Sequence, residues 1–197
     1  MDYITYAVPF FLLALLVELA YGIAIKKNTY RLNDAISNLF MGTLRTANKL
    51  IIIGAAGYVF YLAETKFALW RLDAKSPITW VFAFIIYDFF YYWFHRISHE
   101  RQIFWASHVA HHQSEDYNLS TALRQTGTGA FVSWVFYIPM FLIGIPSYVF
   151  ISVASLNLIY QFWVHSEHIP KLGWYENYFV TASNHRVHHA QNDQYID

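Results

Sequence analysis

The sequence predicts an all-α fold, an integral membrane helical bundle that carries a polyhistidine metal site. Of its 197 residues, 56% are apolar, 20% are aromatic and only 13% are charged, whereas about a quarter of the residues in a soluble domain are charged. Several apolar runs approach the length of about 20 residues that crosses a bilayer. All ten histidines lie in two stretches, residues 95–112 and 165–189. Lipid is therefore the predicted environment, and the histidines mark the predicted site.

The N-terminal third predicts two membrane spans. The first span is Ile4–Ile25, and Glu18 within it should face protein because a carboxylate facing lipid is costly. A polar hinge, Lys26–Asp34, follows. Residues 35–50 are semi-polar and are expected along the membrane interface, and a second span begins near Leu44 and ends at Ala63.

The remaining apolar segments predict a third span and a hairpin. The third span, Ile78–Phe94, runs directly into the first histidine. Two further runs, Phe131–Ile145 and Tyr148–Val164, are separated by Pro146-Ser147, which is typical of a tight helical hairpin. Each run is near the short limit for a full span, so the hairpin either crosses the bilayer or enters it partway.

The charge distribution predicts an orientation in the membrane. The positive-inside rule places Lys26, Lys27 and Arg31 in the cytoplasm. Counting crossings then places both histidine stretches on the cytoplasmic face, although the basic loop 66–75 would lie outside. We expect residues 1–197 to form a single domain in a bacterial inner membrane or an endoplasmic reticulum membrane, with its active site on the cytoplasmic face.

The spacing of the histidines predicts metal binding. The chain contains His-x-x-x-His at residues 95–99 and His-x-x-His-His at residues 108–112 and 185–189. Histidines three or four residues apart share one helix face, and neutral imidazole is the commonest metal ligand. Each stretch is therefore expected to present a row of ligands that point in the same direction.

The ligand types favour two first-row transition-metal ions. Structural zinc sites usually include cysteine, and this chain contains none. Zinc proteases need His-Glu-x-x-His, but here Glu100 follows the pair His95 and His99. Eight or nine imidazoles suit two ions with open positions, and iron is preferred because an open site allows O2 binding. Zinc or another ion could occupy the same ligands in a preparation.

Polar residues near the histidines are candidates for supporting roles. Asp88, Glu100 and Glu115 are the predicted catalytic residues, and with Asp116 they suit hydrogen bonds to the ligand rings. Glu115 and Asp116 are equally compatible with a solvated loop. Three further side chains either contact substrate or cofactor or brace helices: Asn118, Arg124 and Gln125.

Five sequence motifs carry a family resemblance. They are residues 88–100, 105–112, 114–125, 157–165 and 184–189. These motifs resemble the fatty acid hydroxylase, or sterol desaturase, superfamily of membrane di-metal oxygenases, and within it the alkylglycerol monooxygenase-like members. The likeness extends from about Leu32 to the last residue.

The resemblance implies a ligand set. It assigns metal binding to nine histidines: His95, His99, His108, His111, His112, His165, His185, His188 and His189. Glu100 matches a glutamate beside the first motif of the family. His168 has no counterpart and is expected to be a loop histidine, and Asn184 stands where some relatives have another histidine. Relatives continue beyond the equivalent of residue 197, so the domain is expected to be C-terminally incomplete.

The predicted function is an O2-dependent lipid monooxygenase with two iron ions. It would insert oxygen into a C–H bond of a lipid alkyl chain that arrives from the bilayer along the aromatic stretch 87–94. The resemblance implies cleavage of an alkylglycerol ether with tetrahydrobiopterin as reductant.

Two alternatives stay open. One is a sterol, fatty acid or carotenoid desaturase or hydroxylase with an external electron-transfer partner. The other is a non-catalytic metal-binding membrane protein such as a transporter or sensor. A nucleic acid partner is excluded because the 13 basic and 13 acidic residues balance.

Overall fold

The computed structural model describes residues 2–195, and every regular element in that range is a helix. The α-helices are α1 Ile4–Ala24, α2 Leu32–Lys66, α3 Pro77–Glu100, α4 Gln102–His112, α5 Ile138–Ile143, α6 Ser147–Trp163 and α7 Ala182–His188. The 3₁₀ helices are η1 Thr121–Leu123, η2 Thr128–Phe131, η3 Ser133–Tyr137, η4 Gly173–Asn177 and η5 Asp193–Tyr195. The all-α prediction is confirmed for this part of the chain.

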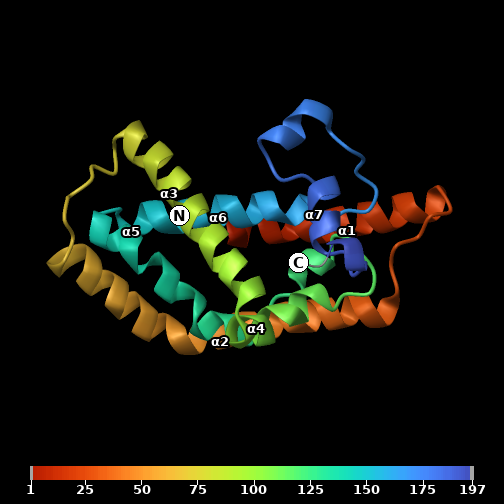
Figure 1. The fold of residues 1–197 in the computed structure, drawn as a ribbon, viewed down its shortest axis with the longest axis horizontal. Coiled ribbons are helices and arrows are strands. Elements are labelled where there is room, and N and C mark those ends of the chain that lie inside the picture. Colours follow the sequence, from red (N-terminus) through yellow and green to blue (C-terminus); the bar gives the residue numbers. More distant parts are fainter. Residues whose placement is uncertain (1, 196–197) are drawn as a thin grey trace.

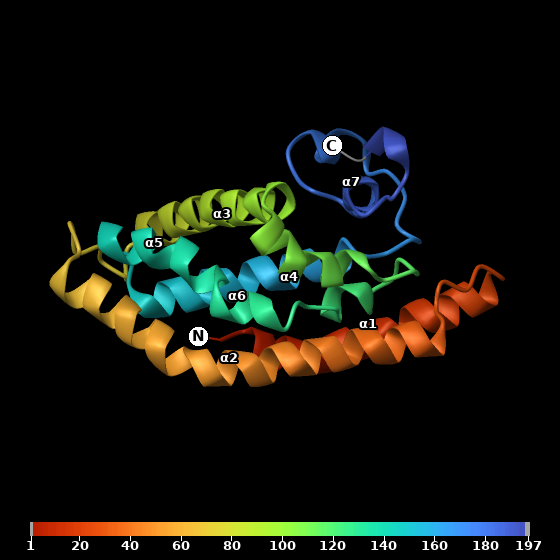
Figure 2. The ribbon, with the colours of Figure 1, turned by 60° about the horizontal axis from the view of Figure 1, so that its bottom comes forward.

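Three helices are long and apolar enough to cross a membrane, namely α1, α2 and α3. Most of their large apolar side chains point outward, as expected for surfaces in contact with lipid. Residues 35–50, expected along the interface, and the span expected to begin near Leu44 belong to one helix, α2, of 35 residues. At 1.5 Å per residue this helix is about 50 Å long, which exceeds the roughly 30 Å of bilayer hydrocarbon. Figure 2 shows α2 running along one side of the molecule.

The predicted hairpin is present, but its first arm differs from the prediction. Residues 131–145 form η3 and the short α5 rather than one helix, and Pro139 stands at the beginning of α5, where its missing N–H costs nothing. Gly144 ends α5 with φ +102°, a left-handed conformation that favours glycine. A Cβ atom there would lie 2.0 Å from the carbonyl oxygen of Trp70. The turn is therefore packed against the loop that precedes α3.

The apolar core lies between α2, α3, α5 and α6. Ala63 on α2 and Ala83 on α3 are buried, and their small side chains let these helices approach the hairpin. Phe60 and Phe141 stack with ring centroids 4.2 Å apart. Helix α7 lies away from α5 and close to the C-terminal end of α6 (Figure 1). The core thus holds α3 and α6 in a fixed relation, and their C-terminal ends carry histidines.

Glu18 attaches α1 to the histidine-bearing part of the molecule. Its side chain is buried and accepts hydrogen bonds from the Tyr30 hydroxyl (2.5 Å), the Leu119 N–H (2.8 Å) and the Ser166 hydroxyl (2.5 Å). The expectation that Glu18 faces protein is therefore confirmed. Its three partners belong to the hinge after α1, the loop before η1 and the residue next to His165.

Candidate metal centre

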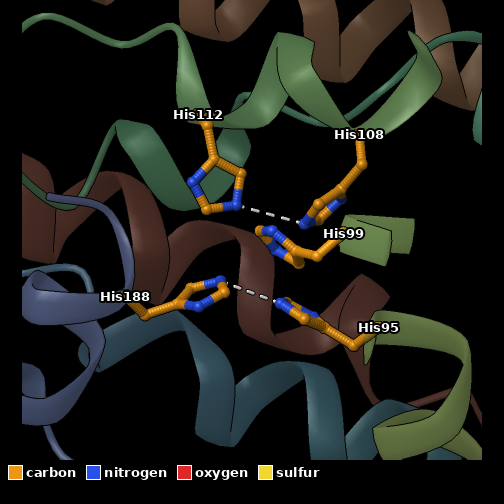
Figure 3. Close-up of side chains that lie close together, drawn as sticks. All are labelled: His95, His99, His108, His112 and His188. Atoms are coloured by element: carbon orange, nitrogen blue, oxygen red, sulfur yellow. Dashed lines mark hydrogen bonds between the residues drawn. The ribbon is translucent and has the colours of Figure 1, made fainter. Parts of the chain in front are cut away.

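Nine of the ten histidines converge in two groups. Within each group, one ring nitrogen per histidine lies within 4.8 Å of all the others. Group one consists of His95, His99, His108, His112 and His188, and group two consists of His111, His165, His185 and His189. Figure 3 shows the five side chains of group one pointing toward one another from α3, α4 and α7. These are the nine histidines that the resemblance assigns.

Helical geometry divides the ligands between the groups. Residues four apart lie on the same face of a helix, so His108 and His112 of α4 both join group one. Likewise, His185 and His189 at the end of α7 both join group two. In each motif, the histidine directly before the last one points about 100° away from it around the helix axis. That histidine joins the other group. The predicted row of ligands pointing in one direction is wrong, because each His-x-x-His-His motif supplies both groups.

Two local features bring the ligand-bearing helices together. Arg101 has extended backbone (φ −117°, ψ 121°), which ends α3 and allows α4 to begin at the next residue in another direction. Helix α7 begins with a capping box, in which the Thr181 hydroxyl and Asn184 exchange hydrogen bonds with each other's backbone N–H groups. Asn184 is thus a helix-capping residue.

The side chain of Arg186 positions α7 against the segment that follows α6. Its guanidinium donates hydrogen bonds of 2.8–3.2 Å to the carbonyl oxygens of Ser166, Glu167 and Ile169. Because Arg186 lies between His185 and His188 in the sequence, these bonds set the position of α7 beside His165.

The distances between ring nitrogens fit metal coordination. Five pairs of Nε2 atoms lie 2.9–3.3 Å apart, including His95 with His188 and His111 with His165. Metal–imidazole bonds of about 2.0–2.1 Å place neighbouring ligand nitrogens roughly 2.9–3.4 Å apart in octahedral or tetrahedral geometry. The donor set of each group therefore suits a first-row ion. The groups also adjoin, since the rings of His112 and His189 stack with centroids 4.2 Å apart.

Hydrogen bonds to Nδ1 orient three of the rings. Nδ1 of His111 donates to the carbonyl oxygen of Arg124 (2.9 Å), and Nδ1 of His165 donates to that of Gln161 (2.8 Å). Nδ1 of His95 lies 3.3 Å from the Tyr91 hydroxyl. In each case the tautomer with hydrogen on Nδ1 leaves the Nε2 lone pair available for a metal ion.

Burial keeps these imidazoles neutral. Outside the predicted spans, loss of hydration and repulsion from neighbouring histidines lower the pKa of His108 to about 2 and that of His165 to about 3. The pKa of His188 falls to about 4 for the same reasons. Burial also lowers the pKa of His111 to about 4, although its hydrogen bond to Arg124 opposes this shift. Neutral rings are the form that binds metal.

A polar network braces the second histidine motif. The Arg124 guanidinium donates to the carbonyl oxygen of Ala110 (2.6 Å) and to Oδ1 of Asn38 (3.0 Å), and it lies 3.7 Å from Asp34. Asn118 donates to the carbonyl oxygen of Thr29 (2.7 Å). The sequence left two roles open for Arg124 and Asn118, namely contact with substrate or cofactor and bracing of helices. These contacts support bracing. Gln125 donates locally, to the carbonyl oxygen of Ala122 (2.9 Å).

The three predicted catalytic carboxylates have other neighbours. Glu100 forms an ion pair with Arg96 (2.7 Å), and Glu115 forms one with Arg31 (2.5 Å). Asp88 is exposed on α3. Among the described residues, neither metal-binding group includes a carboxylate. Nδ1 of His95, His111 and His165 instead lies within hydrogen-bond distance of a tyrosine hydroxyl and of two backbone carbonyl oxygens. The catalytic role of these carboxylates stays a prediction.

His168 lies outside both groups, as expected for a loop histidine. Its ring packs edge-on against Tyr21 of α1, with centroids 5.3 Å apart. Its Nε2 atom lies close to Gly22, where a Cβ atom would approach it to 3.2 Å. His168 therefore serves as a natural control for the histidines of the two groups.

Two further polar residues connect the groups, and the sequence reasoning missed them. The Tyr91 hydroxyl, which contacts His95, donates to Oε1 of Gln161 (2.6 Å). The carbonyl oxygen of Gln161 in turn accepts from His165. The contacts therefore run from group one through Tyr91 and Gln161 to group two. The sequence could have indicated both residues, because each lies one helical turn before a ligand histidine and so shares its helix face.

Replacing Tyr91 with phenylalanine should weaken metal binding by group one about tenfold, the lower end of the range for residues that support ligands. The His95 ring would lose the hydroxyl that holds its orientation. Metal titration against a competing chelator measures the change. The matched control is Tyr58→Phe, at an exposed position of α2 (63% exposed). Equal affinities in the two variants would show that the Tyr91 contact does not support the site.

Comparison with known proteins places the chain in a family. The fatty acid hydroxylase family profile matches residues 80–196. The chain belongs to the fatty acid hydroxylase family. The matched region includes all nine histidines of the two groups, so the motifs that carry the resemblance lie within the family region.

Relatives of the chain include named enzymes. The chain is 45% identical to human alkylglycerol monooxygenase and 41% identical to that of Xenopus tropicalis, in each case over 100% of the chain and 44% of the relative. It is 28% identical to an ornithine lipid hydroxylase of Rhizobium tropici, over 76% of the chain and 48% of the relative. No solved structure matches. The chain thus spans less than half the length of these relatives.

Proposed function

We propose that the chain forms the catalytic domain of a membrane di-iron oxygenase, which inserts one oxygen atom of O2 into a C–H bond of a lipid alkyl chain. The observation that carries this proposal is the pair of adjoining, all-histidine groups, of which group one includes two histidines near the C-terminal end of α3, a helix suited to cross a membrane. Membership of the fatty acid hydroxylase family supports the same reaction type. In this proposal residues 1–197 act as a single domain.

Each group would hold one ion. Group one offers five nitrogen ligands and group two offers four. An octahedral ion has six coordination positions, so each ion would keep at least one open position. Imidazole suits iron, and open positions suit O2 chemistry. When bound, the two irons would supply the electron transfer that activates O2 for attack on a C–H bond. The protein supplies ligand geometry through Tyr91 and the carbonyl oxygens of Arg124 and Gln161.

The proposed substrate is an alkylglycerol, because the relatives that match the whole chain carry the name alkylglycerol monooxygenase. Hydroxylation of the carbon next to the ether oxygen yields a hemiacetal, and the second atom of O2 leaves as water after uptake of two electrons and two protons. The hemiacetal collapses to a fatty aldehyde and glycerol. Tetrahydrobiopterin or an external electron donor would supply the electrons. We place the site at the cytoplasmic face, as the positive-inside rule predicts.

The test uses the iron-loaded chain in lipid nanodiscs with a 1-O-alkylglycerol, O2 and tetrahydrobiopterin. We expect O2 uptake together with fatty aldehyde, and no aldehyde from an ester-linked acylglycerol of the same chain length. A stable hydroxylated lipid would instead favour hydroxylation without cleavage, the reaction named in the ornithine lipid relative. Product lighter by two hydrogens would indicate a desaturase. Tight metal binding without turnover of any lipid would contradict the proposal.

A further inference from the structure

Arg45 on α2 differs from the other arginines of the chain, because it is neither exposed nor paired with a carboxylate. Arg71 and Arg101 are exposed. The remaining four form ion pairs with acidic side chains, namely Arg31, Arg96, Arg124 and Arg186. Arg45 is half-buried, and among residues 2–195 its guanidinium has no ion-pair partner.

The position of Arg45 makes an unpaired charge costly. Helix α2 is suited to cross a membrane, and an ionisable side chain in such a helix usually marks a binding site or an ion pathway. The side chains that interact with Arg45 electrostatically are the neutral phenols of Tyr87, Tyr91 and Tyr137. A guanidinium carries several N–H donors and no acceptor. Arg45 therefore lacks a negatively charged acceptor for its donors.

The hydroxyl group of Thr126 lies close to the Arg45 guanidinium, on either side of the space beside Gly129. A Cβ atom on Gly129 would clash with Oγ1 of Thr126 and would lie 3.2 Å from Nη1 of Arg45. Thr126 is buried, at 7% exposure. The absence of a side chain at Gly129 therefore leaves room between the two polar groups.

The hydrogen bonds around Thr126 leave its own hydrogen available. The Thr128 hydroxyl donates to Oγ of Ser107 (2.8 Å), and the Ser107 hydroxyl donates to Oγ1 of Thr126 (2.8 Å). The Gly129 N–H donates to the same Thr126 oxygen (2.9 Å). Thr126 thus accepts two hydrogen bonds, and no acceptor for its O–H is found in the part of the chain that the structure describes. Arg45 and Thr126 are two neighbouring donors that both need an acceptor.

The metal centre adds positive charge next to these donors. Its nine ligands are all imidazoles, and neither group includes a carboxylate among the described residues. Neutral ligands leave the charge of bound divalent ions uncompensated. Asp34, a carboxylate of the neighbouring network, is already paired with Arg124. An anion beside Arg45 would be attracted both by the guanidinium and by the metal ions.

The available space limits the size of such an anion. Thr126 and Gly129 line a hollow of about 10 Å³ together with His108 of group one. A hollow of this volume has room for about one water-sized atom. A monoatomic anion suits this space, whereas the several oxygens of a phosphate or a sulfate do not.

We propose that Arg45 and Thr126 bind a chloride ion, or a halide of similar size, beside His108. The ion accepts hydrogen bonds from the guanidinium and from the hydroxyl, and it offsets part of the positive charge of Arg45 and of the metal centre. Neither residue belongs to the two histidine groups, so the site goes beyond the proposed function and does not depend on it.

The first test measures chloride binding to the metal-loaded chain in detergent by chloride NMR line broadening, with sodium gluconate to keep the ionic strength constant. Arg45→Met should weaken chloride binding about 100-fold, because the ion loses a charged hydrogen-bond donor. The matched control is Lys49→Met, which removes a positive charge one helical turn further along α2 at an exposed position and should leave chloride binding unchanged. Equal chloride affinity in the two variants would overturn the proposal.

The second test uses a milder pair of variants. Thr126→Val keeps the shape of the side chain but removes the hydroxyl and should weaken chloride binding about tenfold, whereas Thr126→Ser should retain it. In the unmodified chain, chloride should raise the unfolding temperature more than gluconate does, because it binds the folded state. Equal stabilisation by the two salts, or displacement of chloride by an equal concentration of inorganic phosphate, would contradict a halide site. These measurements require no turnover, so they separate this proposal from the proposed function.

Discussion

His188→Ala and His189→Ala should each remove a different metal ion, although the two residues are consecutive. His188 belongs to group one and His189 to group two, because they point about 100° apart at the end of α7. Each variant leaves the other group complete. We expect metal content to fall from two ions toward one, and lipid oxidation to fall by about 100-fold or more, since a lost ligand should cost at least as much as a lost supporting residue. Elemental analysis and iron spectroscopy measure the first change, and aldehyde formation measures the second.

The matched control for both variants is His168→Ala. His168 lies within the second histidine stretch, residues 165–189, but it belongs to neither group. Its removal should leave metal content unchanged. The two ligand variants should also differ from each other in the spectrum of the remaining ion, because five nitrogens surround one site and four the other. Loss of both ions in each variant, with identical residual spectra, would contradict two separable sites.

Glu18→Ala should strongly destabilise the protein, although the residue lies outside the metal centre. The carboxylate is 7% exposed and accepts three hydrogen bonds, from Tyr30, Leu119 and Ser166. Removing it leaves the buried Leu119 N–H without its acceptor and breaks two hydrogen bonds to a charged group. We expect a loss of about 3 kcal/mol or more in the free energy of unfolding. Denaturant unfolding in detergent, followed by tryptophan fluorescence, measures this loss.

Two further variants make this prediction specific. Val17→Ala, next to Glu18 but 59% exposed, should change stability little. Glu18→Gln keeps an acceptor oxygen and should lose less stability than Glu18→Ala. Because Ser166 follows His165, Glu18→Ala should also lower the temperature at which metal is released. Equal stability of Glu18→Ala and Val17→Ala would mean that the three bonds do not hold α1 to the site.

Local patterns in the sequence determined the elements and the ligand set. The lengths of apolar segments predicted α1 and α3, because crossing a bilayer requires a minimum length of apolar helix that satisfies its own backbone. The position of Glu18 inside an apolar run was sufficient to place it against protein. The family motifs identified all nine residues that converge, whereas the histidine spacing alone predicted only that each stretch presents several ligands, because residues three or four apart lie near one another on a helix.

Only the tertiary structure decided how these parts combine. It joined residues 35–50 to the second span as one helix and divided residues 128–143 into short helices, since packing overrides weak local preferences. It allocated His111 and His112 to different groups, and it connected His95 to His165 through Tyr91 and Gln161. These features depend on contacts between residues tens of positions apart, and sequence periodicity within one helix carries no information about such contacts.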